Sequence, residues 1–379
     1  MKKLYWQSHF LPRSFMIVMC IFSLLAVAIV EYHQLLTPEK YYREKLAAAL
    51  LTNSSMEAVK KYRLSLGVPI DHFADPQKSG LIGAPITQIT SDHGNLDSKR
   101  TSINPNLSAL VVTWLKEINL KKGDKVAIGL TGSFPALNIA VLSAIKTLKL
   151  KPVIIVSAGA SQWGANIPGL SWINIQHYLY QKRLLPYKPT AASLGGIEDR
   201  AWGLSKAGKN ILRSAIDEYH IPFIDSKNAK DAISKRMKIY AQYESKNSRI
   251  KAYINIGGGT ASLGKNNTRK RTLKSGLITS LPVTALSDES VTTTFLKRGV
   301  PVINLANVDH LAKQYGFPES PQDKQMVGYG SLFFHKTYNI YLATGALAVI
   351  ILFLVIVSIA KKKLFIYTMK FYDFENKDT

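Results

Sequence analysis

The sequence contains a single cysteine, Cys20, among its 379 residues. One thiol cannot form an intrachain disulfide or supply a set of thiolate ligands to a metal ion. Because Cys20 lies inside an apolar stretch near the N-terminus, a catalytic thiol is also excluded from the long segment that follows. The segment therefore contains no intrachain disulfide, no thiolate metal centre and no cysteine nucleophile.

Nucleotide-binding fingerprints and internal repeats are also missing. Neither Gly-x-Gly-x-x-Gly nor Gly-x-x-x-x-Gly-Lys-Ser/Thr occurs in the proper context between a strand and a helix. The sequence shows no repeat of about 20 to 50 residues. We therefore expect no nucleotide cofactor, and no cofactor of another kind.

Two long apolar stretches lack charged side chains. Residues 340–360 contain 21 such residues in a row, and residues 14–30 contain 17. A helix that crosses a hydrocarbon core of ~30 Å at ~1.5 Å per residue needs about 20 residues. We predict transmembrane helices at 14–30 and 340–360. An Ala-Val-Ala sequence at residues 26–28 leaves cleavage of the first stretch as a signal peptide open.

Lysine and arginine near these stretches indicate how the chain crosses the membrane, since basic residues resist translocation. Three basic residues flank the first stretch on each side, so this stretch does not indicate an orientation in the membrane. Around the second stretch two lysines precede, and five follow, namely Lys361, Lys362, Lys363, Lys370 and Lys377. We predict a protein of the cytoplasmic (inner) membrane whose termini, 1–13 and 361–379, are cytoplasmic and whose segment 31–339 is extracytoplasmic.

Acidic residues are scarce. The sequence has 25 Asp and Glu and 49 Lys and Arg, which gives a net charge of +24. Residues 1–13 carry +3 and residues 361–379 carry +2, which leaves +19 on the central segment. A basic domain attracts polyanions or anionic surfaces. No nucleic-acid motif is present and an exported domain seldom meets nucleic acid, so we expect membrane lipids or other polyanions as partners. The alternative to polyanion binding is that the high lysine content serves only to keep the protein soluble.

Short apolar runs alternate with helical patterns through residues 105–339. Buried parallel strands are predicted at 126–130, 152–156, 252–256 and 300–305. The first two, with the apolar helix 135–148 between them, form a βαβ unit. The alternation predicts an α/β fold with a mostly parallel sheet and helices on both faces, in one or two lobes.

Residues 31–104 carry two helical patterns before the predicted sheet begins. The first covers 40–51, after Thr37 and Pro38, and the second begins at Ser54 or Ser55. We expect this region to form a helical stalk and connection between the first membrane helix and the α/β domain.

The loop at residues 129–135 follows a predicted strand and precedes a predicted helix. In an open α/β sheet, ligands bind at the carboxyl ends of the strands. Thr131, Gly132 and Ser133 lie there, and the free amides and positive dipole end of the helix would bind a carboxylate or phosphate. The simpler alternative is that Ser133 caps the helix that Pro135 begins.

Ser133 is also a candidate nucleophile, because its place between strand and helix resembles a nucleophile elbow. The Gly-x-Ser-x-Gly spacing is absent, so a base has to come from elsewhere in the chain. His310 and His93 are the candidates. This arrangement would make the protein a hydrolase or transpeptidase, whereas a role in binding needs no such base.

A second glycine-rich loop follows the predicted strand 252–256. Its glycines allow a ligand or the opposite lobe to approach the backbone closely, and an ordinary glycine turn is the alternative. The residues that we predict to bind a ligand, from both loops, are Thr131, Gly132, Ser133, Asn255, Gly257, Gly258, Gly259 and Thr260.

Three residues on a predicted loop, Asp92, His93 and Asp97, are candidates for a metal site. Carboxylate and imidazole ligands suit Mg, Mn or Zn. Their irregular spacing does not favour such a site, and we expect no bound metal ion.

Five segments of the chain carry a resemblance to a known family. They are Lys-Arg-Thr-Ser-Ile-Asn-Pro-Asn at 99–106, Gly-Leu-Thr-Gly-Ser-Phe-Pro-Ala-Leu-Asn at 129–138, Ser-Ala-Gly-Ala-Ser-Gln-Trp-Gly-Ala-Asn at 157–166, Ala-Ser-Leu-Gly-Gly at 192–196 and Ile-Gly-Gly-Gly-Thr-Ala-Ser-Leu-Gly at 256–264. In this order they resemble the bacterial poly-gamma-glutamate system protein family. The resemblance covers most of the central segment.

The resemblance implies a role in making, exporting or anchoring the poly-gamma-glutamate capsule, alongside the other components of the poly-gamma-glutamate synthase. It implies no catalytic mechanism. The polymer is a dense polyanion, since it exposes one carboxylate per residue, and this fits the charge of the central segment. We expect a membrane-anchored accessory protein that binds the polymer. The alternatives are a hydrolase or transpeptidase acting on γ-glutamyl bonds, and a scaffold for anionic cell-wall components.

Overall fold

The computed structural model describes residues 13–265 and 272–375, and it divides into two units. One unit combines the two ends of the chain, Met1–Pro38 and Phe334–Thr379, and the other is Glu39–Phe333. The predicted cytoplasmic segments lie partly outside the described residues, at 1–12 and 376–379. Each unit has its own internal packing.

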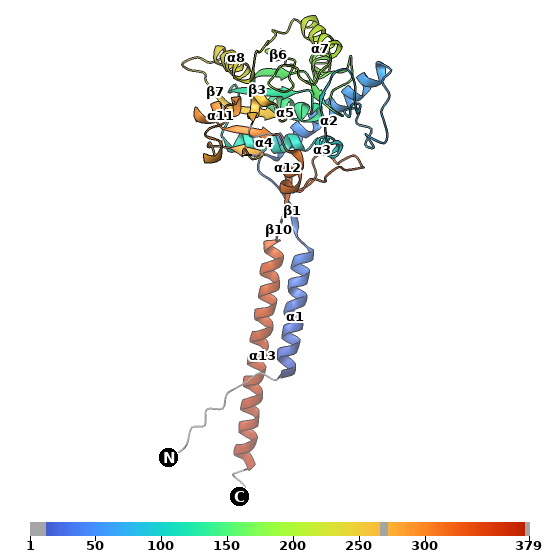
Figure 1. The fold of residues 1–379 in the computed structure, drawn as a ribbon. Coiled ribbons are helices and arrows are strands. Elements are labelled where there is room, and N and C mark those ends of the chain that lie inside the picture. The colour runs from blue at the N-terminus through green and yellow to red at the C-terminus, as the bar shows by residue number, and fades with distance from the viewer. Residues whose placement is uncertain (1–12, 266–271, 376–379) are drawn as a thin grey trace. The chain divides into compact units, whose positions relative to one another are not determined.

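The terminal unit consists of two long helices and a short β-ribbon. Helices α1 (Arg13–Tyr32) and α13 (Ile340–Glu375) lie side by side, and strands β1 (Leu35–Pro38) and β10 (Phe334–Thr337) pair antiparallel (Figure 1). Phe353 of α13 stacks on Phe15 of α1, with ring centroids 5.8 Å apart. Parts of both helices, Ser14–Tyr32 and Ile340–Ala360, are long and apolar enough to cross a membrane.

The globular unit is built on a six-stranded sheet with the order β6-β4-β3-β7-β9-β8. The strands are β3 (Lys125–Thr131), β4 (Lys151–Ser157), β6 (Ala191–Ser193), β7 (Ile250–Ile256), β8 (Gly276–Ile278) and β9 (Val302–Leu305). All neighbours are parallel except the edge strand β8, which runs antiparallel to β9. Two further strands, β2 (Thr90–Asp92) and β5 (Ala160–Ser161), form a separate parallel pair. The prediction of an α/β fold with a mostly parallel sheet is confirmed.

The described helices of the globular unit cover this sheet. They are α2 (Tyr42–Ser65), α3 (Leu96–Ser102), α4 (Leu107–Glu117), α5 (Pro135–Thr147), α6 (Trp172–Gln181), α7 (Lys206–Glu218), α8 (Ala229–Gln242), α9 (Thr260–Leu263), α11 (Val291–Lys297) and α12 (Val308–Tyr315), with a short 3-10 turn at Val283–Ala285. Helices α2, α4 and α5 contact one another, and α8, α9 and α11 form a second group.

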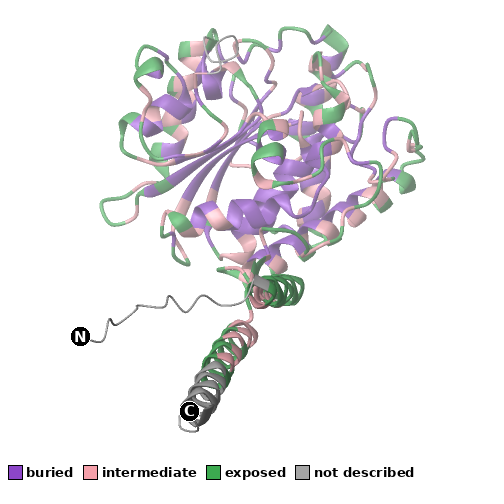
Figure 2. Cartoon of the chain, turned by 90° about the horizontal axis from the view of Figure 1, so that it is seen from below, coloured by how far each residue is buried: buried purple, intermediate pink, exposed green. Residues whose placement is uncertain are grey.

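Side chains of alternate residues in the central strands enter two different cores. Ile128 of β3 and Ile254 of β7 belong to the larger core, together with residues of α4 and α5. Their chain neighbours Ala127 and Tyr253 belong to the smaller core, with Phe295 of α11. This alternation places apolar side chains on both faces of the sheet, as a strand covered by helices on both sides requires. The strands are accordingly buried along their length (Figure 2).

The region predicted as a stalk differs from the expectation. Residues 39–104 belong to the globular unit, and α2 packs against α4 and α5. The two predicted helices around residue 52 form the single helix α2, because the polar residues between them do not cap a new helix. Instead the Thr52 hydroxyl donates to the Ala48 carbonyl (2.8 Å) and the Ser54 hydroxyl donates to the Leu50 carbonyl (3.0 Å).

The order of the strands changes direction between β3 and β7. From β3 the chain proceeds outward to β4 and β6, and it then returns to place β7 on the other side of β3. At such a point the connections leave in opposite directions, and a crevice opens outside the carboxyl ends of the two strands. The loops after β3 and β7 therefore frame the expected position of a ligand.

Candidate functional site

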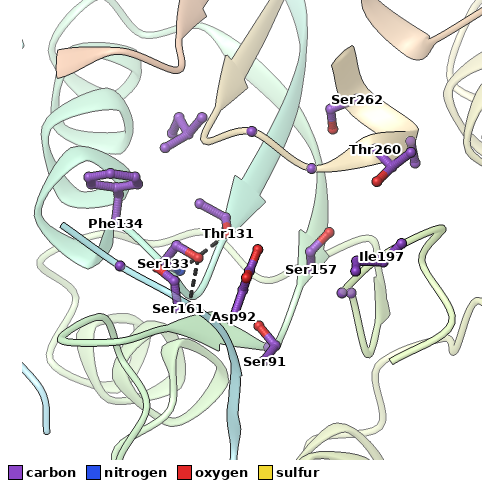
Figure 3. A pocket seen from close by; sticks show the side chains of 18 of the residues that line it. Ser91, Asp92, Thr131, Ser133, Phe134, Ser157, Ser161, Ile197, Thr260 and Ser262 are labelled. Carbon is purple, nitrogen blue, oxygen red and sulfur yellow. Dashed lines mark hydrogen bonds between the residues drawn. The ribbon is translucent and has the colours of Figure 1, made fainter. Parts of the chain in front are cut away.

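A cavity of about 860 Å³ lies at the carboxyl ends of the parallel strands. The loops after β3, β4, β6 and β7 line it, and the segment of β2 and α3 closes another side. Its lining includes eight hydroxyl side chains, which are Ser91, Ser98, Thr131, Ser133, Ser157, Ser161, Thr260 and Ser262. Side chains from these separate elements converge on the same space (Figure 3). The cavity is thus polar and well supplied with hydrogen-bond donors and acceptors.

The two predicted ligand-binding loops meet at this cavity. Among the predicted residues, those that line it are Thr131, Ser133, Gly258, Gly259 and Thr260. Gly132, Asn255 and Gly257 are not among the lining residues. The Asn255 side-chain amide donates to the Gly257 carbonyl (2.9 Å) and to Asn304 Oδ1 (3.0 Å), so it holds the loop rather than a ligand.

Gly257 is required by close packing between the two loops. It has a φ of 81°, and a Cβ at this position would lie 2.9 Å from Cγ2 of Thr131. A side chain there would therefore be strained by the backbone conformation and would collide with the neighbouring loop. The role of Gly257 is to let the loops after β3 and β7 approach each other.

The predicted metal and histidine candidates separate in the structure. Asp92 and His93 line the cavity, whereas Asp97 interacts with Arg100 and Ser320. The described residues contain no group of three or more His, Cys, Asp or Glu side chains that could hold a metal ion. His310 lies on α12, is exposed, and is not part of the cavity lining.

Ser133 is bound to neighbours other than histidine. Its backbone N–H donates to Thr131 Oγ1 (3.1 Å), and its hydroxyl oxygen accepts the backbone N–H of Ser161 (3.0 Å), as Figure 3 shows. Within the described ranges, no hydrogen bond joins Ser133 to His93 or His310. The alternative that Ser133 caps α5 does not hold either, since Phe134 is the N-cap residue and has no side-chain cap bond.

The loop after β4 is fixed in place by backbone hydrogen bonds. The N–H of Ala165 donates to the Gly132 carbonyl (2.8 Å), and the N–H of Trp163 donates to the Ala84 carbonyl (2.9 Å). Just before these residues, β5 pairs with β2. Ser161, at the end of β5, is therefore presented to the cavity from a tightly held segment.

Lys99 is the most unusual ionisable group of the cavity. Its side chain is only 2% exposed, and its Nζ lies 2.5 Å from the Ser133 carbonyl oxygen and 2.7 Å from Ser161 Oγ. The amine also sits 3.9 Å from the centroid of the Phe134 ring. Burial lowers the pKa of Lys99 to about 7, because a charged amine is poorly solvated there. Near neutral pH a substantial fraction of this lysine is uncharged.

Arg236 and Asp199 form a buried ion pair at the wall of the cavity. Arg236 Nη2 lies 3.0 Å from both carboxylate oxygens and also donates to Ser193 Oγ (2.8 Å) and Ser157 Oγ (3.1 Å). Burial alone lowers the pKa of Arg236, but the interactions with Asp199, Tyr240 and Tyr253 together outweigh it and raise the pKa. The pair ties the loop after β6 to the ends of β4 and β6.

The charges of the cavity nearly balance. Asp199 is neutralised by Arg236, and Glu198 pairs with Lys265. The carboxylate of Asp92 faces the cavity, while Lys99 is partly uncharged. The positive charge of the central segment is therefore located mostly on other surfaces, and the cavity presents chiefly hydroxyl and amide groups.

Sequence reasoning missed Lys99, Ser157 and Ser161. The rule that ligands bind after the strands applies equally to the loop after β4, and it would have found the two serines. Lys99 lies 62 residues before Ser161, on a helix that precedes the sheet, and nothing in its local sequence marks it as buried. Only the fold brings it to this loop.

Comparison with protein-family models, with curated proteins and with solved structures found no match for this chain.

Proposed function

We propose that the protein is a membrane-anchored accessory of poly-gamma-glutamate synthesis or export, and that its cavity receives a segment of this carboxylate-bearing chain. One observation carries the proposal. Each of the five segments that resemble the poly-gamma-glutamate system family contributes residues to the lining of the cavity, including Lys99, Thr131, Ser161, Gly195 and Thr260. Segments spread over more than 150 residues of the sequence thus contribute to the lining of one cavity.

Charge and recognition are divided between different parts of the globular unit. The net charge of +19 on residues 31–339 attracts a polyanion over a distance set by screening, about 8 to 10 Å at physiological ionic strength. The balanced cavity then binds the amide backbone and individual carboxylates through its hydroxyls. Other components of the polymer synthase and anionic lipids are further partners of such a protein, and nucleic acid is not.

The geometry of the terminal unit supports a two-span topology. α1 leads into β1 and β10 leads into α13, and the antiparallel pairing of these strands directs both helices away from the ribbon on the same side (Figure 1). If both helices cross the membrane, the two ends of the chain share one side. The five lysines after residue 360 favour the cytoplasm for that side, with residues 31–339 outside the cytoplasm.

Calorimetric titration of the detergent-solubilised chain with short poly-gamma-glutamate oligomers tests the binding role. We expect saturable binding that weakens with salt, and a further loss of about tenfold in affinity for Thr131→Val, which removes a hydroxyl from the cavity. Ser54→Ala, an exposed change on α2, is the matched control and should bind like the wild type.

Two outcomes would contradict this role. The first is equal affinity of the wild type and Thr131→Val, which would separate the polymer from the cavity. The second is tighter binding of teichoic acid or anionic vesicles than of poly-gamma-glutamate, which would favour a scaffold for anionic cell-wall components.

A hydrolase or transpeptidase acting on γ-glutamyl bonds is the second candidate. The contact between Lys99 and Ser161 favours it, because it provides the nucleophile and base that Ser133 and the histidines do not provide. One cavity can both bind the polymer and catalyse acyl transfer, and a separate experiment tests each role.

A further inference from the structure

Lys99 and Ser161 are placed as a proton acceptor and a proton donor. Ser161 Oγ lies 2.7 Å from Lys99 Nζ, within the range of a good hydrogen bond. An uncharged lysine amine has two N–H donors and one lone pair. One N–H is used by the Ser133 carbonyl oxygen, 2.5 Å away, which leaves the lone pair free to accept the proton of the Ser161 hydroxyl.

The surroundings of Lys99 favour its uncharged form. Among the ion pairs found in the described part of the chain, none involves Lys99, and its side chain is nearly inaccessible to water. The Phe134 ring and the Ser133 carbonyl would each attract an ammonium, but burial outweighs them and lowers the pKa of Lys99. A lysine kept neutral by burial is the form that acts as a general base.

Ser161 itself meets the needs of a nucleophile. It lines the cavity, is partly exposed, and lies at the end of β5, where pairing with β2 fixes the backbone. Its N–H donates to Ser133 Oγ, which orients the two serines toward each other. The O–H of Ser133 has no acceptor among the described residues, so it is available as a donor to an oxygen that develops negative charge next to Ser161.

We propose that Ser161 and Lys99 form a catalytic nucleophile and general base for acyl transfer at an amide bond. The identity of the substrate as a carboxylate-bearing γ-linked amide rests on the proposed function, whereas the pair itself rests on the geometry alone.

The reaction balances without a cofactor. Ser161 Oγ attacks the amide carbonyl carbon while its proton passes to Lys99 Nζ, and the carbonyl oxygen becomes an oxyanion near the Ser133 hydroxyl. The carbon–nitrogen bond then breaks, and the leaving amine takes the proton from the Lys99 ammonium. Water in hydrolysis, or a second amine in transpeptidation, then attacks the acyl ester on Ser161. Lys99 accepts the proton of the attacking group and passes it to Ser161 Oγ as the ester carbon–oxygen bond breaks.

Covalent labelling of the full chain in detergent micelles with an alkyl fluorophosphonate tests the pair. Ser161 Oγ should displace fluoride from phosphorus, adding one probe per chain, and peptide mapping should place the adduct on Ser161. Ser161→Ala should take up no probe, and Lys99→Met should be labelled about 100-fold more slowly or worse. Ser54→Ala and Lys238→Met, both on exposed helix positions away from the cavity, should be labelled like the wild type.

The pH dependence of labelling can be measured on the wild type, so this test does not depend on whether the variants fold. The rate should rise about tenfold per pH unit at low pH and level off above pH 7, as Lys99 loses its proton. The other ionisable groups that line the cavity are Asp92 and His93 before α3, Glu198 and Asp199 after β6, and Lys265 after α9. The same profile should persist in His93→Asn.

Several results would overturn the pair. They are a wild type that takes up no probe, an adduct on another serine, a flat pH profile, and a profile abolished by His93→Asn, which would make His93 the base. Because the probe carries no glutamate, labelling of Ser161 does not depend on the polymer. Labelling without polymer binding would leave the pair intact and refute the proposed substrate, whereas binding without labelling would do the reverse.

Discussion

The guanidinium of Arg236 and the carboxylate of Asp199 meet at 3.0 Å in a part of the protein where both side chains are almost completely buried. The two residues lie 37 positions apart, on α8 and on the loop after β6. Asp199 has a φ of 60°, in the left-handed region, as do Glu198 and Ala201 on either side of it. A loop with such a backbone needs strong anchoring, and the ion pair supplies it.

Replacement of Arg236 by Met should destabilise the globular unit severely. The variant leaves the Asp199 carboxylate buried without its partner, which costs about 3 to 5 kcal/mol in comparable pairs. Urea unfolding of the detergent-solubilised chain measures the free energy. Lys230→Met, which breaks the exposed pair with Glu289, is the control and should cost less than about 1 kcal/mol. A similar small loss for both variants would contradict the structural role of the pair.

Replacement of Lys99 by Met should change how stability depends on pH. In the wild type the pKa of Lys99 is lowered from 10.5 to about 7, so between these values the unfolded chain binds more protons than the folded one. Wild-type stability should therefore rise with pH across this window, by about 2 kcal/mol between pH 7 and 9 from this residue. Urea unfolding at both pH values should show that Lys99→Met lacks this increase. Parallel pH profiles of the two proteins would refute the lowered pKa.

Close packing of the backbone against Gly83 leads to a prediction about this glycine. A Cβ at this position would lie 2.0 Å from the Gly164 carbonyl oxygen, at the point where the Gly83 N–H donates to Trp163. Gly83→Ala should therefore cost about 1 to 3 kcal/mol, because the packed backbone cannot move aside. It should also slow the labelling of Ser161, which the same loop carries. Gly259→Ala is the control for stability, since nothing lies within 4 Å of its Cβ position.

The single cysteine makes the membrane topology directly testable. In a Cys20→Ser background, a cysteine at position 54 should react with a membrane-impermeant maleimide in intact cells, because Ser54 is exposed on the globular unit. A cysteine at position 377 should react only after the cells are permeabilised. Reaction of both sites in intact cells, or of position 377 alone, would contradict the predicted orientation.

The sequence predicted those features that depend on neighbouring residues. Apolar runs such as 126–130 and 252–256 indicated the central strands, and the parallel arrangement followed from the helices between them. A rule about strand ends predicted that Thr131 and Thr260 each lie in a ligand-binding loop, but it left open whether the two loops share one cleft. These inferences needed no knowledge of which distant segments come together.

Features that depend on distant segments escaped prediction. Lys99 contacts Ser161 only because α3 packs near the loop after β4, and Arg236 contacts Asp199 only because α8 covers the end of β6. The short strand β8 lies antiparallel at the edge of the sheet and pairs with β9 alone, so its three residues carry little pattern. The hydroxyls of α2 were predicted to begin a helix, because a serine that caps and a serine that bonds back within a helix look the same in the sequence.

Hydrogen exchange of the full chain, with and without poly-gamma-glutamate oligomers, tests whether the polymer occupies the cavity. Oligomers should slow exchange in the segments 131–134, 157–161 and 258–262, which contribute lining residues to the cavity from three different loops. The effect should be absent in segments remote from the cavity, such as 206–218 on α7. Protection that is spread over lysine-rich surfaces while these three loops exchange as before would show that the polymer does not enter the cavity.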